Sequence, residues 1–182
     1  MKRSRYQVQF RRRRECRTDY NSRFALLKSG RTRLVIRRSS GNMLVQFVNF
    51  NEKGDVIVAS AATQTLKKHG WGAPTGNIPA SYLAGLAAGV HAKKKGVTDA
   101  ILDNGVQTST KGSRIYAALK GVIDAGIKVP HSADVLPSND RISGKHIAEW
   151  AGKAGGFTKY KVAPAEMQKH FEQVKEKIMH GV

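Results

Sequence analysis

The order of the apolar segments constrains the fold of this chain more than any other feature of its sequence. Three short apolar runs, residues 33–38, 43–50 and 56–61, have the composition of strands and are separated only by turn-forming residues. This spacing predicts an antiparallel meander. Beyond residue 76 the apolar spacing becomes that of helices, with a short buried strand predicted over residues 100–102. Strands followed by helix–strand alternation indicate an α/β fold, a mixed sheet with helices on its faces.

Three strong helices are expected after the meander, over residues 78–94, 113–125 and 164–180. The first carries Gly85 and Gly89 four residues apart. We interpret this pair as close packing of the helix on the sheet rather than as a ligand site.

Weaker patterns complete the secondary structure. A short helix is predicted over residues 19–28 and a weak helix over residues 141–152. Residues 63–76 are expected to form a polar loop.

The chain of 182 residues fits one ordinary domain with extensions and can bury a core without a covalent staple. Its single cysteine, Cys16, excludes an internal disulfide framework and a cysteine-based zinc site. We expect an Arg-rich RNA-binding extension over residues 1–30, a mixed α/β core over 31–130, and a C-terminal extension with a terminal helix over 131–182.

The distribution of charge predicts a polyanionic partner. The net charge is +19, and the first 38 residues hold 14 Lys and Arg against two acids, or +12. Twelve of those 14 cations are Arg, whose planar fork grips phosphate bidentately. The sequence lacks the roughly 18 consecutive apolar residues of a membrane span and the apolar core of a signal peptide. We therefore expect a soluble, intracellular protein that binds nucleic acid or an anionic membrane surface.

Aromatic residues are interleaved with arginines in the run from Lys2 to Arg17, a pattern that suits stacking on unpaired bases. The alternative is a nuclear-targeting or solubilising tail, in which aromatic side chains would have no role. A membrane tail would need an apolar stripe, which this run lacks. Because like charges repel, we expect residues 1–12 to be extended or disordered without RNA. The candidate RNA-binding residues of this segment are Arg3, Arg5, Tyr6, Phe10, Arg11, Arg12, Arg13, Arg14, Arg17 and Arg23.

A second candidate phosphate site is the loop over residues 106–114, which follows a predicted strand and opens a predicted helix. Lys111 and Arg114 would converge there with backbone amides, and Ser113 is expected to be the N-cap. Thr110 stands where a Walker P-loop requires glycine, so a nucleotide loop is excluded. By itself the pattern fits an ordinary capped loop equally well, and the basic N-terminus favours phosphate contact.

No catalytic residue, metal site or cofactor is predicted. The six histidines lack metal-ligand spacing, and no nucleophile elbow is present. A nuclease needs clustered carboxylates that hold a divalent metal, but the core candidates Asp55, Asp99, Asp103 and Asp124 are scattered over the predicted elements. A metal-dependent nuclease is therefore the weakest alternative, behind a free-standing RNA-binding or assembly factor.

Several segments, taken in order, resemble one ribosomal protein family. Residues 6–15 (YQVQFRRRRE) and 17–20 (RTDY) resemble the start of the 5S rRNA-binding protein of the large subunit, the archaeal form of the L-eighteen family, related to the eukaryotic L-five protein. Further matches follow collinearly at GNIPA (76–80), KGSR (111–114), AALKG (117–121), DAG (124–126) and PHS (130–132). Each match alone is weak, whereas the ordered set is specific. Cys16 stands where the family usually has glycine.

The resemblance implies a three-layer α/β core related to the ribonuclease-H-like fold, used as a binding scaffold without catalysis. It implies a structural role in the central protuberance of the cytoplasmic ribosome, where 5S rRNA is attached to large-subunit rRNA. The implied partners are both RNAs and neighbouring ribosomal proteins, including the other 5S rRNA-binding protein. The charge pattern by itself predicts only a polyanionic partner, and the identity of 5S rRNA comes from the resemblance alone. Which of the two RNAs the N-terminus contacts remains open.

Overall fold

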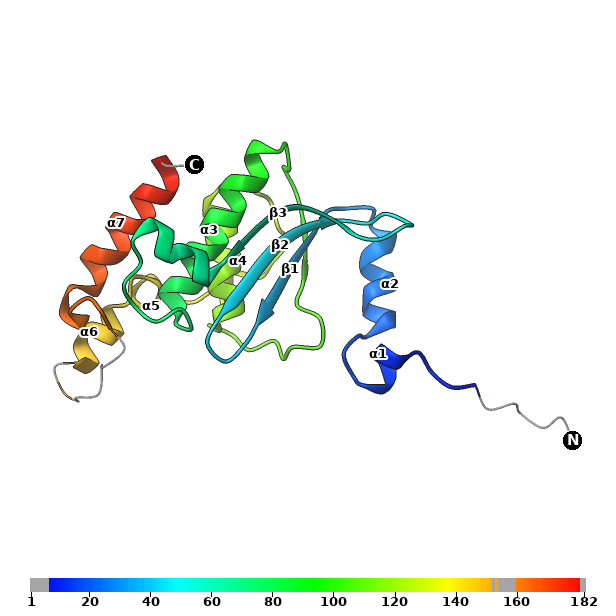
Figure 1. Ribbon diagram of the computed structural model, residues 1–182, viewed down its shortest axis with the longest axis horizontal. Coiled ribbons are helices and arrows are strands. Elements are labelled where there is room, and N and C mark those ends of the chain that lie inside the picture. Colours follow the sequence, from blue (N-terminus) through cyan, green and yellow to red (C-terminus); the bar gives the residue numbers. More distant parts are fainter. Residues whose placement is uncertain (1–6, 152, 154–159, 181–182) are drawn as a thin grey trace, which may run out of the picture.

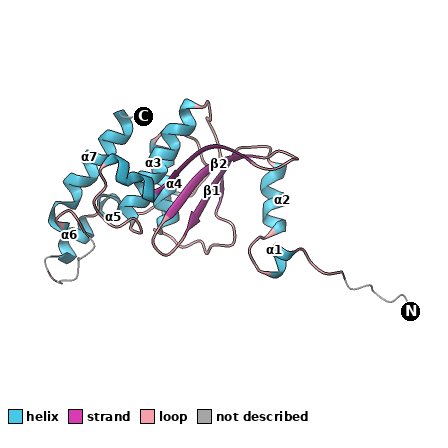
Figure 2. Cartoon of the chain, in the orientation of Figure 1, coloured by secondary structure: helices cyan, strands magenta, loops and turns pink. Residues whose placement is uncertain are grey.

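The computed structural model describes residues 7–151, 153 and 160–180 (Figure 1). Figure 2 shows a central sheet flanked by helices, with the N-terminal segment at the end of the molecule opposite the C-terminal helix. None of the helices within the described ranges is long and apolar enough to cross a membrane. The helices are α1 (Arg11–Arg14), α2 (Tyr20–Lys28), α3 (Ile78–Lys94), α4 (Arg114–Asp124), α5 (Asn139–Ser143), α6 (Lys145–Ala151) and α7 (Met167–His180), with short 3₁₀ turns η1 (Thr63–His69), η2 (Ala133–Val135) and η3 (Pro164–Glu166).

The sheet has four strands in the order β3-β2-β1-β4. Their bounds are β1 (Arg33–Arg38), β2 (Met43–Asn49), β3 (Val56–Ala62) and β4 (Ile101–Asp103). The pairs β1–β2 and β2–β3 are antiparallel, and β4 adds to β1 in parallel. The predicted meander and the mixed α/β sheet are both confirmed.

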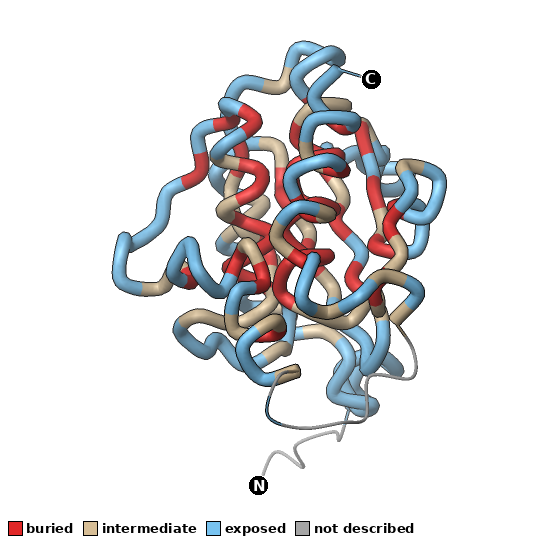
Figure 3. Tube along the Cα trace, turned by 90° about the vertical axis from the view of Figure 1, so that its left-hand side faces the viewer, coloured by how far each residue is buried: buried red, intermediate tan, exposed pale blue. Residues whose placement is uncertain are grey.

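One face of the sheet carries the core. Leu34 and Ile36 lie opposite Phe47 and Val45, and all four side chains are fully buried. This follows from the alternation of side chains along a strand, which places residues 34 and 36 on the same face. Helix α3 contacts β2 and β3 on this face, and α4 contacts β1. Figure 3 shows the buried residues gathered between the helices and the sheet.

The two core helices approach each other at glycines. A Cβ placed on Gly85 would stand 2.0 Å from the carbonyl oxygen of Ala118, and one on Gly121 would stand 2.2 Å from that of Tyr82. A Cβ on Gly89 would likewise meet Ala125 of the same segment. The prediction that Gly85 and Gly89 pack α3 on the sheet is therefore wrong, since both glycines face α4.

The C-terminal segment completes the core. The predicted terminal helix is confirmed as α7, and its apolar stripe of Met167, Phe171, Val174 and Ile178 is buried. Helix α7 packs on the outer side of α3, so the layers are the sheet, the α3–α4 pair and α7.

Two predicted segments are more structured than expected. The polar loop predicted over residues 63–76 begins as η1, with Leu66 fully buried and Trp71 nearly so, so that prediction is wrong. The weak helix predicted over residues 141–152 is divided into α5 and α6 by Gly144, whose φ of +84° interrupts the helical backbone.

Candidate nucleic-acid interface

Helix α1 and the turn after it present an exposed cluster of arginines. The expectation of an extended or disordered chain through residue 12 is wrong at Arg11 and Arg12, which lie in α1. None of the residues of α1 is buried. Two of the predicted RNA-binding residues are paired within the chain, because Arg11 Nε lies 2.7 Å from Glu15 Oε1 and Arg17 Nε lies 3.1 Å from Glu15 Oε2. Exposed ion pairs of this kind are weak, typically about 0–1 kcal/mol, so both guanidinium groups can exchange Glu15 for a phosphate.

The remaining arginines of this run differ in their freedom. Arg12 Nε donates a hydrogen bond of 2.9 Å to Thr18 Oγ1. Arg13 and Arg14 make no side-chain hydrogen bond or ion pair with any residue that the structure describes. These two side chains are therefore the freest cations of the cluster.

The aromatic residues of the N-terminus are only partly described. Phe10 is 74% exposed, and its ring centroid lies 5.6 Å from that of Tyr20 in a tilted pair. The outer face of Phe10 is therefore open to a base. The predicted residues Arg3, Arg5 and Tyr6 lie outside the described residues.

Helix α2 begins at a capped turn. The Asp19 carboxylate accepts hydrogen bonds from the backbone N–H groups of Asn21 (3.0 Å) and Ser22 (3.2 Å) and from Ser22 Oγ (2.7 Å). The bond from the Ser22 hydroxyl and the backbone bonds lower the pKa of Asp19 below its ordinary value, and the charge of Arg13 adds to this. The cap fixes the start of the helix that carries Arg23.

Arg23, a predicted RNA-binding residue, is tied to the sheet by a network of ion pairs. Arg23 Nη2 lies 2.8 Å from Asp55 Oδ2, and Arg33 Nη2 lies 2.6 Å from the same oxygen. Arg33 continues the network through Nη1 to Asp103 Oδ2 at 3.2 Å, and Arg37 Nη2 binds Asp103 Oδ1 at 2.8 Å. Neither Arg33 and Arg37 nor this network was predicted from the sequence.

The electrostatics of the network favour charged carboxylates. Burial by itself raises the pKa of Asp55, but the hydrogen bonds and charges of Arg33 and Arg23 outweigh it and hold the pKa below its ordinary value. Arg33 is 2% exposed, so its charge depends on these partners. The sequence suggested that Asp55 and Asp103 are scattered, but the structure brings them together, because the guanidinium group of Arg33 binds both.

This pairing with arginine makes a metal site unsuitable here. A cation already occupies the space between the two carboxylates of Asp55 and Asp103. Across the described part of the chain, no group of three or more His, Cys, Asp or Glu side chains is arranged to hold a metal ion.

A cleft lies between the N-terminal segment and the ends of β1 and β4; we call it the arginine cleft. Its volume is about 240 Å³. Its walls come from the N-terminal segment, from Arg37 of β1 and from residues 103–107 at and beyond the end of β4. Its cationic lining residues are Arg12, Arg17, Arg23 and Arg37, and the carboxylates of Asp19 and Asp103 line it as well. Arg17, Arg23 and Arg37 each pair with a carboxylate of the chain. Guanidinium groups that converge on one cavity suit a phosphate group, which would compete with these carboxylates.

The loop before α4 is the second predicted site, and its three candidate residues differ in environment. Lys111 is exposed and has no polar partner among the described residues. Ser113 occupies the N-cap position, but its hydroxyl makes no capping bond and is buried without a hydrogen-bond partner in the described structure. Arg114 Nη1 donates to the carbonyl oxygens of Gly76 (2.9 Å) and Ser40 (3.3 Å). Lys111 is therefore the free cation of this loop, and Arg114 also has a structural role.

The loop is fixed to the β1–β2 turn at two places. Gln107 donates to the carbonyl oxygen of Arg38 (2.9 Å) and accepts from its N–H (3.2 Å), while Arg114 binds Ser40 seven residues later. The structure thus brings this loop beside the arginine cleft, which residues 103–107 border.

One signal in the sequence could have identified the missed arginines. Arg33 and Arg37 lie four positions apart in β1, so their side chains share one face of the sheet, opposite the face on which Leu34 and Ile36 are buried. Two charged residues on the same face of an inner strand indicate a polar cluster there.

Comparison with known proteins places the chain among ribosomal proteins. Residues 4–100 and 90–132 match the family described as ribosomal large subunit proteins 60S L5 and 50S L18. The large ribosomal subunit protein uL18 of Korarchaeum cryptofilum is 56% identical over 149 residues, covering 82% of this chain and 76% of that protein. The uL18 proteins of Haloarcula marismortui and Natronomonas pharaonis are 43% and 46% identical, each covering 95% of its own length and 97% and 96% of this chain.

Proposed function

The chain belongs to the family of ribosomal large subunit proteins 60S L5 and 50S L18, and from this premise we propose that it binds 5S rRNA and attaches it to large-subunit rRNA in the central protuberance. A member of this family is a structural protein of the large ribosomal subunit and takes part in translation.

The arginine cleft is the observation that carries the proposal. It brings arginines of the N-terminal segment and of β1 together on one cavity, beside the exposed arginines of α1. Arginine side chains arranged in this way bind phosphate groups and can stack on unpaired bases. An RNA with both helical and unpaired segments, such as a folded rRNA, offers both kinds of contact.

We propose that the protein acts as a scaffold without catalysis and that it is located in cytoplasmic ribosomes. Its proposed protein partners are neighbouring ribosomal proteins, including the other 5S rRNA-binding protein. The predicted RNA-binding residues remain proposals, and among them the structure favours Arg13, Arg14 and Lys111, whose side chains are free in the described chain.

Quantitative mass spectrometry of salt-washed large subunits tests the proposal. We expect one copy per subunit, retained together with 5S rRNA. Substoichiometric recovery, limited to immature particles, would instead support an assembly factor. The purified protein should also bind 5S rRNA in a gel-shift titration, with an affinity that falls steeply as salt is added, because each neutralised phosphate releases counterions.

A further inference from the structure

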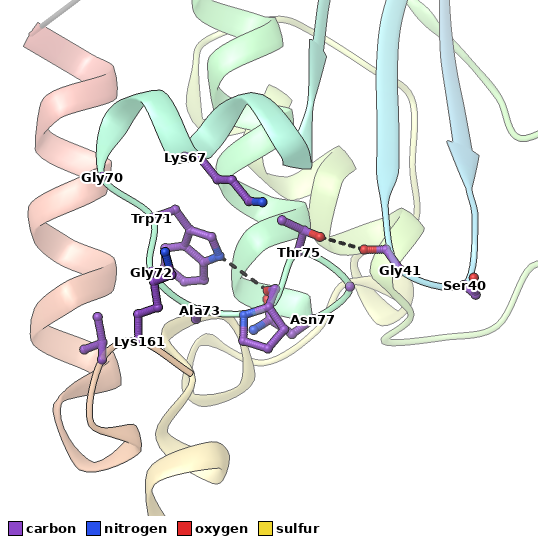
Figure 4. Close-up of a pocket in the computed structure, with 13 residues that line it drawn as sticks. Ser40, Gly41, Lys67, Gly70, Trp71, Gly72, Ala73, Thr75, Asn77 and Lys161 are labelled. Atoms are coloured by element: carbon purple, nitrogen blue, oxygen red, sulfur yellow. Dashed lines mark hydrogen bonds between the residues drawn. The ribbon is translucent and has the colours of Figure 1, made fainter. Parts of the chain in front are cut away.

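A second basic groove lies at the end of the molecule near α7, away from the arginine cleft. Its volume is about 930 Å³. Its floor is the glycine-rich segment 70–77, and its walls are the β1–β2 turn, Lys67 of η1, and residues 161–162 before α7 (Figure 4). We call it the glycine-loop groove.

The wall before α7 is held to the floor through both peptide groups of Gly72. The N–H of Gly72 donates to His170 Nε2 at 3.0 Å, and its carbonyl oxygen accepts from the N–H of Lys161 at 3.0 Å. A Cβ on Gly72 would stand 2.8 Å from Val162 Cγ2, so a larger residue would push this wall away. The groove is therefore a built feature of the fold that depends on the C-terminal segment.

The opposite wall is fixed by the β1–β2 turn. Thr75 Oγ1 donates to the carbonyl oxygen of Gly41 at 2.8 Å (Figure 4). Arg114 reaches the same region from the loop before α4 through its bonds to the carbonyl oxygens of Gly76 and Ser40. The loop thus links the two basic regions, since residues 103–107 line the arginine cleft and Arg114 binds Ser40 and Gly76, which line this groove.

The groove is positively charged and carries no opposing charge of its own. Lys67 and Lys161 line it, and none of its lining residues is acidic. Both lysines are exposed, and neither ammonium group has a hydrogen-bond or ion-pair partner in the described chain. Lys177 adds a third cation near the rim, because its Nζ lies 3.5 Å from the position of a Cβ on Gly70. An anionic ligand is therefore favoured.

The single aromatic side chain of the groove is not available for stacking. Trp71 is 3% exposed, its ring lies 5.1 Å from that of His170, and its Nε1 donates to the carbonyl oxygen of Pro74 at 3.4 Å. A site with free cations and no open aromatic face recognises the phosphates of a nucleic acid rather than its bases.

We propose that the glycine-loop groove is a second RNA site, which binds the phosphodiester backbone of rRNA through Lys67 and Lys161. This inference rests on the proposed function and extends it, because it adds a backbone-binding surface formed by the core and the C-terminal segment. In this arrangement, arginines of the N-terminal segment contact phosphates and unpaired bases of the RNA, and lysines of the groove near α7 contact only its backbone.

The test uses the double variant Lys67→Ala/Lys161→Ala and the matched control Lys53→Ala/Lys94→Ala. Both control lysines are exposed but lie far from the groove along their elements. Lys53 follows the end of β2, and Lys94 is the last residue of α3, whereas both elements begin beside the groove. Binding of the full-length proteins to 5S rRNA and to large-subunit rRNA fragments is titrated as a function of salt. We expect the groove variant to flatten the log–log salt slope by roughly 1.4–1.8 on at least one of these RNAs, at about 0.7–0.9 per phosphate contact, and the control to leave it unchanged.

Reaction of lysines with an acylating reagent, followed by mass spectrometry, gives an independent measurement. In complexes with the RNA that shows the slope change, Lys67 and Lys161 should be protected severalfold, whereas Lys53 and Lys94 should not. Because only exposed side chains are changed, the groove variant should keep the thermal midpoint of the parent protein.

The inference would be overturned if the parent protein bound 5S rRNA but the groove variant kept the parent's salt slope on every RNA and Lys67 and Lys161 stayed reactive in the complexes. A groove variant that kept every slope but lost binding to another ribosomal protein would assign the groove to a protein partner and also overturn it. If the parent protein itself bound none of these RNAs, the proposed function would fail first.

Discussion

The α3–α4 pair and the N-terminal arginine segment, residues 7–28, are held in place by opposite means. In the pair, backbone meets backbone at Gly85 and Gly121, and most residues of both helices are buried. In the arginine segment, neither α1 nor α2 buries a single residue, and an ion pair between Arg23 and Asp55 ties the segment to the sheet.

This difference separates stability from recognition. The pair excludes water and tolerates no added atom, so it determines whether the domain folds. The arginine segment is held by partly exposed ion pairs of low net energy, so its cations can be shared with a ligand. Changes in the pair should therefore alter the free energy of unfolding, and changes in the segment should alter the salt dependence of RNA binding.

The largest effect is expected from Gly85→Ala. The new Cβ would stand 2.0 Å from the carbonyl oxygen of Ala118, so the two helix backbones must move apart. Overpacking against rigid backbone should cost about 3 kcal/mol or more and lower the thermal midpoint by roughly 6–12 °C, if the protein folds at all. Differential scanning calorimetry of the purified variant measures this loss.

Gly41→Ala is the matched control for that prediction. Gly41 has an ordinary φ, and a Cβ there would meet nothing within 4 Å, so its midpoint should stay within about 1–2 °C of the parent value. A Gly85→Ala variant as stable as Gly41→Ala would show that the helix pair can separate without cost.

Deletion of residues 1–17 should have the next largest effect, and on binding alone. If about five arginines of this stretch engage phosphates, the salt slope should flatten by roughly three to five. The thermal midpoint should change little, because the deletion removes none of the buried residues found in the described structure.

The deletion is measured on large-subunit rRNA fragments as well as on 5S rRNA, since the segment can serve either. A truncated protein that kept the full slope on every RNA would move recognition to the lysine-rich core. A truncated protein that melted many degrees lower would break the separation between the two regions.

A smaller change of slope is expected from the loop before α4. Lys111→Ala removes one free cation, and the slope should fall by about one, with similar loss of affinity for all RNAs that use the site. Lys111→Ala/Arg114→Ala should lower the slope by up to about two, and it should also lower the midpoint slightly because Arg114 binds Gly76 and Ser40. An unchanged slope with an unchanged circular dichroism spectrum would make this an ordinary surface loop.

Much of the fold could be predicted because its signals are local. The period of the apolar residues defined β1 and α3 at the residues observed, and it located α7 with its buried stripe. Charge density likewise marked the N-terminal segment as a basic region, although it did not predict helix α1. Such signals are carried by neighbouring residues and need no knowledge of the tertiary structure.

The rest could not be predicted because its partners are far apart in sequence. Arg33 meets Asp103 across 70 positions and Gly72 meets His170 across 98. The small residues of α3 indicated a close contact, but nothing in the sequence distinguished α4 from the sheet as its partner. Free and occupied cations also look alike in sequence, as Lys111 and Arg114 show.

The pH dependence of stability tests the contact between the C-terminal segment and the groove. Burial, and then the charge of Lys177, lower the pKa of His170, and its Nε2 accepts from the N–H of Gly72 only when the ring is neutral there. The unfolded state then takes up the proton first as the pH falls below about 6.5, so stability is full above that pH and declines below it. Loss of the bond should cost about 1 kcal/mol.

Thermal midpoints at about pH 7.5 and about pH 5.5 measure this effect for the parent and for His170→Gln. The parent should lose more stability between the two pH values than the variant, by roughly 2–4 °C. The pKa of His146 is shifted in the same direction, so the variant should retain part of the dependence. Equal losses in both proteins would remove His170 from this role.

The smallest effect is expected at Cys16, in the turn that ends α1. Its φ of +51° makes it the only non-glycine residue with positive φ among the described residues, and the N–H groups of Cys16 and Arg17 bond to the carbonyl oxygens of Arg13 (3.0 Å) and Arg12 (2.9 Å). These bonds are those of a Schellman turn, in which this position favours glycine.

Cys16→Gly should relieve about 1 kcal/mol of backbone strain, partly offset by the greater freedom of glycine when unfolded. Hydrogen exchange of the Arg17 amide should therefore slow by up to about fivefold in Cys16→Gly. Cys16→Ala, which keeps the Cβ, should show no such slowing, and the thermal midpoint of both variants should equal that of the parent because the turn lies outside the core. Equal exchange in the two variants would mean that the turn is held by the surrounding side chains and not by its backbone. A shifted midpoint would couple the arginine segment to the α3–α4 pair after all.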